Sequence, residues 1–230
     1  MDLSLPPDVR AGAFFDLERT VTADAVEQVV ALALWRRGVL SSRALARVFW
    51  CYLRYNLGLL RRFEDLKAEG ARLFEGRDPV ADAAMMEALF AEALRTRIHS
   101  EAKALMRELA ARGVHVAIVS STYAFMVAPY ARELGVAAFH GCLLEKNEGG
   151  RCTGRLAGTI PHQQEKARIV AEIAAAEGLD LAHSWAFGDS INDVPMLEAV
   201  GRPVAVNPSA GLRRIAAKRG WTIARWGARA

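Results

Sequence analysis

Cysteine is scarce in this sequence, and several patterns that mark common protein classes are missing. The cysteines number three, an odd count without the spacing of a metal site or a disulfide framework: Cys51, Cys142 and Cys152. Their thiols are therefore expected to be reduced, as in the cytoplasm. No run of about 20 apolar residues is uninterrupted by polar ones, which argues against a transmembrane helix. The first ten residues also lack the basic-then-apolar pattern of a secretory signal, so we expect a cytoplasmic location.

Dense blocks of one charge are also missing. The formal net charge is only +4, and no cluster of Lys and Arg is compact enough to predict nucleic-acid binding. The five histidines show no ligand spacing and are expected to be structural or exposed. With 230 residues, 52% hydrophobic and 24% charged, the chain can form one sizeable domain, or a core with a smaller inserted domain.

What stands out instead is an apolar run that ends in two carboxylates and a hydroxyl. Ala13-Phe14-Phe15 is typical of a buried parallel strand, and Asp16, Glu18 and Thr20 follow it directly. Two carboxylates on one side of an extended chain repel each other unless a cation or a shared proton lies between them. The pattern is compatible with a metal site, and equally with a charged loop after a strand.

The rest of the chain divides into a helical block and an alternating region. Apolar periodicity predicts helices at residues 23–37 (capped by Thr22), from about 42, at 59–74 and at 80–94. Strands are then expected at 114–119, in a hairpin at 141–156, and at 183–187, 203–206 and 221–224, with helices between them. This alternation predicts an α/β fold with a Rossmann-like parallel sheet, interrupted after its first strand by a helical insertion.

Polar residues end three of the predicted strands, and these ends should lie at one edge of the sheet. They are Asp16 with its neighbours, Ser120 with Ser121, and the segment 188–193. In open parallel sheets, ligands bind at the carboxyl ends of the strands. The sequence therefore predicts one site built from distant segments.

Four motifs in order resemble those of the haloacid dehalogenase superfamily, in its phosphoserine phosphatase-like branch, subfamily IB. They are Asp16-x-Glu18-x-Thr20, Ser120 after an apolar strand, Lys166 near a helix start, and Gly188-Asp189-Ser190-x-Asn192-Asp193. The resemblance covers nearly the whole chain. It implies a Rossmann-like core at residues 1–21 and 98–230, and a helical cap domain at 22–97.

The resemblance also implies a role for each motif residue in phosphoryl transfer. Asp16 would be the nucleophile, with Glu18 and Lys166 as further catalytic residues. Phosphate would be bound by Thr20, Ser120, Ser121 and Lys166. Mg²⁺ would be held by Asp16, Asp189 and the backbone carbonyl of Glu18. Asn192 and Asp193 would contact these ligands and orient them, and Asp193 can also bind the ion directly.

Glu18 departs from the family pattern, which usually has a second Asp here as general acid and base. Glu lengthens the arm by one methylene, and small misplacements of a catalytic group can cost on the order of a hundredfold in rate. The substrate is expected to be a small phosphorylated metabolite. Phosphoserine is not favoured, because Ala25 occupies the position where phosphoserine phosphatases carry an acid.

The predicted cap is rich in arginine and aromatic residues, with examples in Trp35, Arg43, Trp50 and Arg54. Such residues suit the core and solvated face of a helical bundle, which we prefer, or a surface that contacts anionic lipid. Three functions follow. The preferred one is a Mg²⁺-dependent phosphomonoesterase; the others are a phosphoryl-binding or regulatory protein with turnover impaired by Glu18, and a peripheral lipid-phosphate phosphatase.

Overall fold

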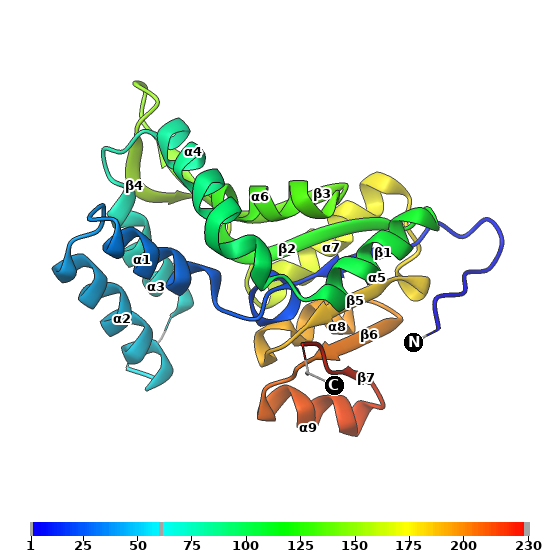
Figure 1. Cartoon of the computed structure of the whole chain (residues 1–230). Coiled ribbons are helices and arrows are strands. Elements are labelled where there is room, and N and C mark those ends of the chain that lie inside the picture. Colours follow the sequence, from blue (N-terminus) through cyan, green and yellow to red (C-terminus); the bar gives the residue numbers. More distant parts are fainter. Residues whose placement is uncertain (1, 60–61, 228–230) are drawn as a thin grey trace.

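A seven-stranded sheet forms the centre of the computed structural model, which describes residues 2–59 and 62–227 (Figure 1). The strands lie in the order β4-β3-β2-β1-β5-β6-β7. Their bounds are β1 Gly12–Phe15, β2 His115–Tyr123, β3 Ala138–Lys146, β4 Cys152–Ala157, β5 Trp185–Gly188, β6 Arg202–Val206 and β7 Thr222–Ala224. Neighbouring strands are parallel except β3 and β4, which form the predicted antiparallel hairpin. The predicted α/β fold with a largely parallel sheet is confirmed.

Helices cover both faces of this sheet. Their bounds are α1 Val26–Arg36, α2 Ser42–Asn56, α3 Phe63–Ala71, α4 Pro79–Leu89, α5 Ser100–Ala111, α6 Ala124–Leu134, α7 Gln164–Glu177, α8 Val194–Glu198 and α9 Ala210–Arg219. The buried side chains of α5 and α6 share one apolar core, and those of α7, α8 and α9 share the other. Within the described residues, no helix has both the length and the apolar character that crossing a bilayer requires.

The central strand β1 is buried on both faces because its two phenylalanines point to opposite sides. Phe14 belongs to the core under α7 and α8, and Phe15 to the core under α5 and α6, as the alternation of an extended chain requires. The Phe15 ring stacks on Phe187 of β5, with ring centroids 4.1 Å apart. β1 thus lies between β2 and β5, and the residue after it emerges at the centre of the sheet edge.

Strand β2 is longer than predicted. The sequence suggested that the strand ends at Val119, before the two serines, but pairing with β3 resumes at Tyr123. The register shifts between Val119 and Tyr123, so Ser120 and Ser121 lie in an irregularity inside the strand. Such bulges re-aim side chains next to active sites.

Helices α1, α2 and α3 lie to one side of the sheet, on the left in Figure 1, whereas α4 packs against α6. The chain leaves and re-enters the sheet region through two adjacent segments, where Thr22 bridges Ile98 and the Ala23 amide donates to the Arg97 carbonyl. This pairing holds Thr22 outside α1, which begins at Val26 rather than at Ala23 as predicted. The predicted domain boundaries fall at this double connection, and the division into core and cap stays a prediction.

Candidate active site

Three carboxylates from two distant parts of the chain meet at the carboxyl ends of the strands. Asp16 follows β1 directly, Asp189 follows β5, and Asp193 ends the short 3₁₀ turn Ile191–Asp193. One ligand oxygen of each lies within 4.8 Å of the other two. The Asp16 amide donates to the Phe187 carbonyl at 2.9 Å, so the parallel pairing of β1 with β5 brings these acids together.

Lys166 supplies a buried positive charge against this cluster. It lies in the first turn of α7, and its Nζ donates to Oδ1 of Asp16 and to Oδ1 of Asp193, each at 2.6 Å. Burial alone would lower the pKa of Lys166, but the two carboxylates raise it, so the ammonium stays charged. The pair predicted from motif order, nucleophile and lysine, is therefore in direct contact.

The remaining negative charge is poorly balanced. Burial raises the pKa of Asp16 to about 7, with Lys166 opposing the shift and Asp193 adding to it. Burial and the charges of Asp16 and Asp193 raise the pKa of Asp189 to about 8. A divalent cation with oxygen ligands would reverse both shifts, because it interacts favourably with the ionised form of each acid. The donor set therefore fits Mg²⁺.

Asp193 also stabilises the turn that follows Asp189. Its Oδ2 accepts hydrogen bonds from the amide and the hydroxyl of Ser190, at 3.1 and 3.0 Å, which closes a capping box over the turn. A side chain at Gly188 would place its Cβ 2.5 Å from the Asp193 Cβ, so this approach requires glycine. Asn192 lies at the pocket edge, where its side-chain oxygen accepts from Gln163 Nε2 at 3.3 Å.

The hydroxyls predicted to bind phosphate do not all reach the pocket. Ser121 lines it, whereas Ser120 is fully buried and its hydroxyl accepts from the Thr122 amide at 3.1 Å. Thr20 is also fully buried, and its hydroxyl has no hydrogen-bond partner among the residues that the structure describes. In this structure Ser121 is the predicted phosphate-binding hydroxyl that is placed to contact a ligand.

The pocket above the acids encloses about 210 Å³, and residues of the helices that lie to one side of the sheet form part of its wall. They come from the start of α1 and from α2 and α3: Ala25, Gln28, Tyr52, Tyr55 and Leu66. None of them is assigned a role at this site by the sequence, apart from the missing acid at Ala25. Only the packing of the helices over the sheet edge brings them to the site.

Two further wall residues were not predicted. Arg19, in the turn after β1, has a φ of 58°, which projects an exposed cation beside the acids. His162 stacks on Phe63 of α3 with ring centroids 3.8 Å apart, which joins α3 to the segment before α7. Burial and the charge of Lys166 lower the pKa of His162 to about 4, so its ring is neutral at physiological pH.

Glu18 lies in the pocket wall, but its carboxylate is outside the three-acid cluster. Its Oε1 accepts from the backbone amide of Glu27 at 3.2 Å, in the first turn of α1. The N-cap residue of α1, Ala25, has no side chain that can do this. Glu18 therefore caps α1 from the turn after β1. Its predicted metal contact, through the backbone carbonyl, stays a prediction.

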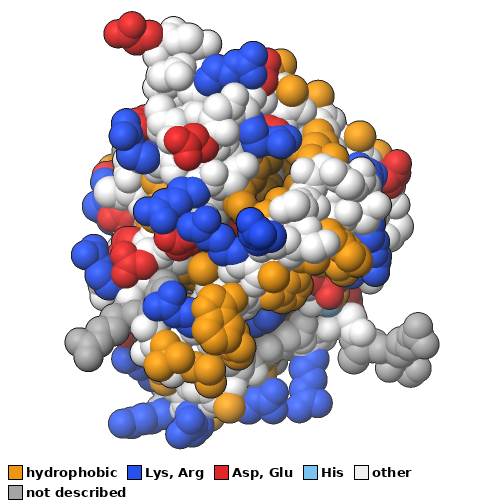
Figure 2. Space-filling model, turned by 90° about the vertical axis from the view of Figure 1, so that its left-hand side faces the viewer, with side chains coloured by type: hydrophobic (Ala, Val, Ile, Leu, Met, Phe, Trp, Pro, Cys, Tyr) orange, Lys and Arg blue, Asp and Glu red, His pale blue; other side chains and the backbone are white. Residues whose placement is uncertain are grey.

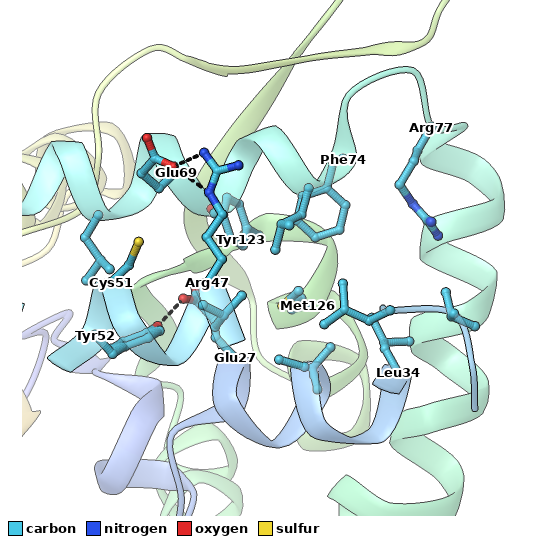
Figure 3. Close-up of a pocket in the computed structure, with 18 residues that line it drawn as sticks. Glu27, Leu34, Arg47, Cys51, Tyr52, Glu69, Phe74, Arg77, Tyr123 and Met126 are labelled. Atoms are coloured by element: carbon cyan, nitrogen blue, oxygen red, sulfur yellow. Dashed lines mark hydrogen bonds and ion pairs between the residues drawn. The ribbon is translucent and has the colours of Figure 1, made fainter. Parts of the chain in front are cut away.

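A buried polar network surrounds this contact. The Lys67 ammonium is buried and pairs with the Glu27 carboxylate. The Tyr52 hydroxyl donates to the same carboxylate at 2.6 Å (Figure 3). The Tyr123 hydroxyl donates to the Lys67 carbonyl at 2.8 Å. Burial and the charge of Glu27 raise the pKa of Glu18, while Lys67 opposes them. Raised acid pKa values are typical of carboxyl groups that transfer protons.

A second, mainly apolar pocket of about 110 Å³ lies on the other side of Tyr52 (Figure 3). Side chains of α1, α2 and α3 line it together with Phe74, Tyr123 and Met126, and Arg47 pairs with Glu69 at its edge. Tyr52 and Leu66 line both pockets, so they form the partition between them. The two side chains therefore separate the acidic pocket above Asp16 from the apolar pocket.

Comparison with known proteins gives a consistent result. Residues 13–198 match the model of the haloacid dehalogenase-like hydrolase family. The chain is 33% identical over 222 residues to an "Inhibition of morphological differentiation protein" of Streptomyces azureus, covering 96% of this chain and 79% of the relative. It is 32% identical over 225 residues to the phosphoserine phosphatase SerB1 of Mycobacterium tuberculosis, covering 96% and 73%.

Solved structures share the fold. A protein of unknown function from Bordetella pertussis Tohama I is 36% identical, with a TM-score of 0.86 over 94% of this chain and 98% of that one. A phospho-aspartyl intermediate analogue of phosphoserine phosphatase is 22% identical, with a TM-score of 0.68 over 95% and 94%, which shows a common fold. The recognised resemblance and the fold class are thereby confirmed.

Proposed function

The chain belongs to the haloacid dehalogenase-like hydrolase family, and on this basis we propose that it is a Mg²⁺-dependent phosphomonoesterase of the cytoplasm. The observation that carries the proposal is the contact of Lys166 with both Asp16 and Asp193, with Asp189 completing the acidic cluster. Phosphatases among the relatives support the reaction class. Asp16 and Asp189 would hold the metal, which would supply charge neutralisation for an anionic substrate.

The first step transfers the phosphoryl group to the protein. A carboxylate oxygen of Asp16 attacks phosphorus, the bond from phosphorus to the ester oxygen breaks, and an aspartyl-phosphate forms. The ammonium of Lys166 holds the nucleophile in place and offsets charge on the transferring group. Ser121 donates a hydrogen bond to a phosphoryl oxygen from the pocket wall.

Proton transfer falls to Glu18. In the first step its carboxyl group gives a proton to the leaving alcohol oxygen, and in the second it takes one from the water that attacks the aspartyl-phosphate. The second step releases inorganic phosphate and restores the Asp16 carboxylate. The raised pKa of Glu18 suits the first role, because burial and the charge of Glu27 favour the protonated form that donates the proton.

The substrate is a small phosphomonoester. A pocket of about 210 Å³ has room for a phosphate and a short organic group. Ala25, Gln28 and neutral His162 line it, so the wall offers hydrogen bonds, and α1, α2 and α3 contribute no carboxylate to it for a substrate ammonium. We therefore place phosphoserine behind phosphomonoesters that lack an ammonium group.

A phosphate-release screen tests the proposal. Purified protein with Mg²⁺ is compared with Asp16→Asn, which keeps the shape of the side chain and removes the nucleophile, on a panel of small phosphomonoesters. Release by the wild type, absent from Asp16→Asn and abolished by EDTA, is expected. Equal release by both proteins would refute the proposal.

The same preparation distinguishes slow turnover from inactivity. If Glu18 limits the second step, a rapid burst of alcohol release equal to the enzyme concentration precedes a slower steady rate. A wild type that binds phosphate analogues without releasing alcohol would instead favour a phosphoryl-binding or regulatory role.

A further inference from the structure

Two long segments of the chain, residues 28–63 and 199–230, contain no acidic residue, and the first of them stands out because of its exposed apolar side chains. Of the 30 Lys and Arg and 26 Asp and Glu in the sequence, residues 28–63 hold seven arginines and none of the acids. The seven are Arg36, Arg37, Arg43, Arg47, Arg54, Arg61 and Arg62. The small net charge of the whole chain therefore hides a strongly basic surface element.

The same segment carries most of the exposed apolar surface. Among the described residues, seven of the twelve exposed large hydrophobic side chains lie in it: Trp35, Val39, Phe49, Trp50, Leu53, Leu57 and Leu59. The preferred interpretation of the sequence assigned the arginine and aromatic residues to the core and the solvated face of a bundle. The structure leaves Trp50 57% exposed, and Trp35 40%. Figure 2 shows hydrophobic side chains grouped on this face with basic ones around them.

Helix α2 arranges these residues in two adjoining stripes. Phe49, Leu53 and Leu57 follow one another at four-residue spacing, with Trp50 beside them. Arg43 and Arg54 flank Trp50 at seven and four residues, on the same outer side. The helix has no acid of its own and is capped by Ser41, which accepts from the Ala44 amide.

Three of these arginines have no acidic partner in the part of the chain that the structure describes. Arg47 pairs with Glu69 and Arg37 with Glu92, but Arg36, Arg43 and Arg54 form no ion pair within residues 2–59 and 62–227. Their charge is free to meet an external anion.

We propose that the outer face of α2, with the adjacent end of α1, docks on the surface of an anionic lipid bilayer. Exposed Trp and Leu can enter the boundary between headgroups and acyl chains, and flanking arginines can contact lipid phosphates. A second copy of the chain fits poorly, because a symmetric contact would set one basic face against another without acids to compensate. The bilayer supplies both the negative charge and the apolar interior that this face lacks.

Docking would set the active site close to the bilayer. Tyr52 and Tyr55 on the inner side of α2 line the pocket above Asp16, opposite the stripe formed by Trp50 and Leu53. The proposal does not depend on the proposed phosphatase activity, since a soluble substrate can reach the pocket without the membrane.

Co-sedimentation of the full chain with vesicles tests the docking. Vesicles of phosphatidylcholine with phosphatidylglycerol are compared with vesicles of phosphatidylcholine alone. Binding to the anionic vesicles only, weakened by added salt and accompanied by a blue shift of Trp fluorescence, is expected. No binding to anionic vesicles, or equal binding to both kinds, would overturn the proposal.

Matched variants locate the surface. Arg36→Gln/Arg43→Gln is expected to weaken anionic binding about 25-fold, at about fivefold for each arginine near the surface. Its control is Arg213→Gln/Arg214→Gln on exposed positions of α9, which should bind as the wild type does. Equal loss in the two double variants would show binding without a defined face and would overturn the proposal.

A second variant and its control test whether apolar side chains enter the bilayer. Trp50→Ser is expected to abolish most of the fluorescence shift and weaken binding at least tenfold, whereas Val80→Ser, at an exposed position of α4, is expected to change neither. Unchanged melting temperatures and unchanged hydrolysis of a soluble substrate confirm that the variants are folded. Vesicle binding by Trp50→Ser at wild-type strength would contradict the assigned face.

Discussion

Shortening Glu18 by one methylene, in Glu18→Asp, is expected to lower both stability and turnover. The Glu18 Oε1 lies 3.2 Å from the Glu27 amide, already near the limit of a hydrogen bond. Removing one carbon–carbon bond withdraws the acceptor by about 1.5 Å, which ends the contact. Helix α1 then begins without a side-chain cap, because Ala25 cannot provide one.

The size of the effect follows from the lost cap. Replacing an N-cap acceptor costs about 1 kcal/mol, which corresponds to a melting temperature lower by about 2–4 °C for a chain of this length. The carboxyl group also moves within the pocket, and such a shift is expected to lower kcat by about tenfold to a hundredfold. The Asp that is usual in the family should therefore be the poorer residue here.

Thermal unfolding and steady-state hydrolysis with Mg²⁺ measure the two effects. Glu18→Gln is the matched control, since it keeps the length and the acceptor for the Glu27 amide while removing the proton donor. It should retain the melting temperature and lose about 10²-fold or more in kcat. A Glu18→Asp protein as stable as the wild type and faster in turnover would refute the reasoning.

Three further predictions concern the acidic cluster. The pKa values of Asp16 and Asp189 are raised from 3.8 to about 7 and about 8. The folded state therefore binds more protons than the unfolded state between about pH 4 and 8. In EDTA, the melting temperature should fall as the pH rises through this range. Mg²⁺ at a hundredfold excess over its Kd should restore about 2.7 kcal/mol at pH 8 and less at pH 6; a larger effect at pH 6 would contradict this assignment. Lys166→Met should lower the free energy of urea unfolding by about 3–5 kcal/mol at pH 8, because it leaves carboxylates buried without their cation; a loss below 1 kcal/mol would show that the pair is not structural. Gly188→Ala places a Cβ 2.5 Å from that of Asp193, so it should destabilise the fold by about 1–3 kcal/mol and weaken the Mg²⁺ shift, and an unchanged Mg²⁺ response would argue against a role for Asp193 at the metal.

The central strands of the fold and the acidic cluster could be predicted, because short runs of apolar and polar residues in the sequence mark them. Ala13-Phe14-Phe15 marks a strand buried on both faces, and the alternation after Ser100 marks a parallel sheet. Parallel strands place their carboxyl ends at one edge, so Asp16, Asp189 and Lys166 were expected together, and they are in one cluster.

Other expectations failed where long-range pairing decided the local structure. Thr22 looks like an N-cap, but its bridge to Ile98 keeps it out of α1. Ser120 looks like a strand end, but β2 continues to Tyr123 and turns that hydroxyl inward. Neither partner lies near in sequence, so no local pattern could reveal the pairing.

The sequence by itself determined the order of the motifs, the sheet and which acids lie together at its edge, because these depend on residue type and on short periodicities. Only the tertiary structure decided what Glu18 touches, which aromatic residues of α1 and α2 stay exposed, and that His162 and Tyr52 face the pocket. Those properties depend on how α1, α2 and α3 pack over the sheet edge. A helix pattern shows that one face is apolar, but it does not show which neighbour covers that face or how completely.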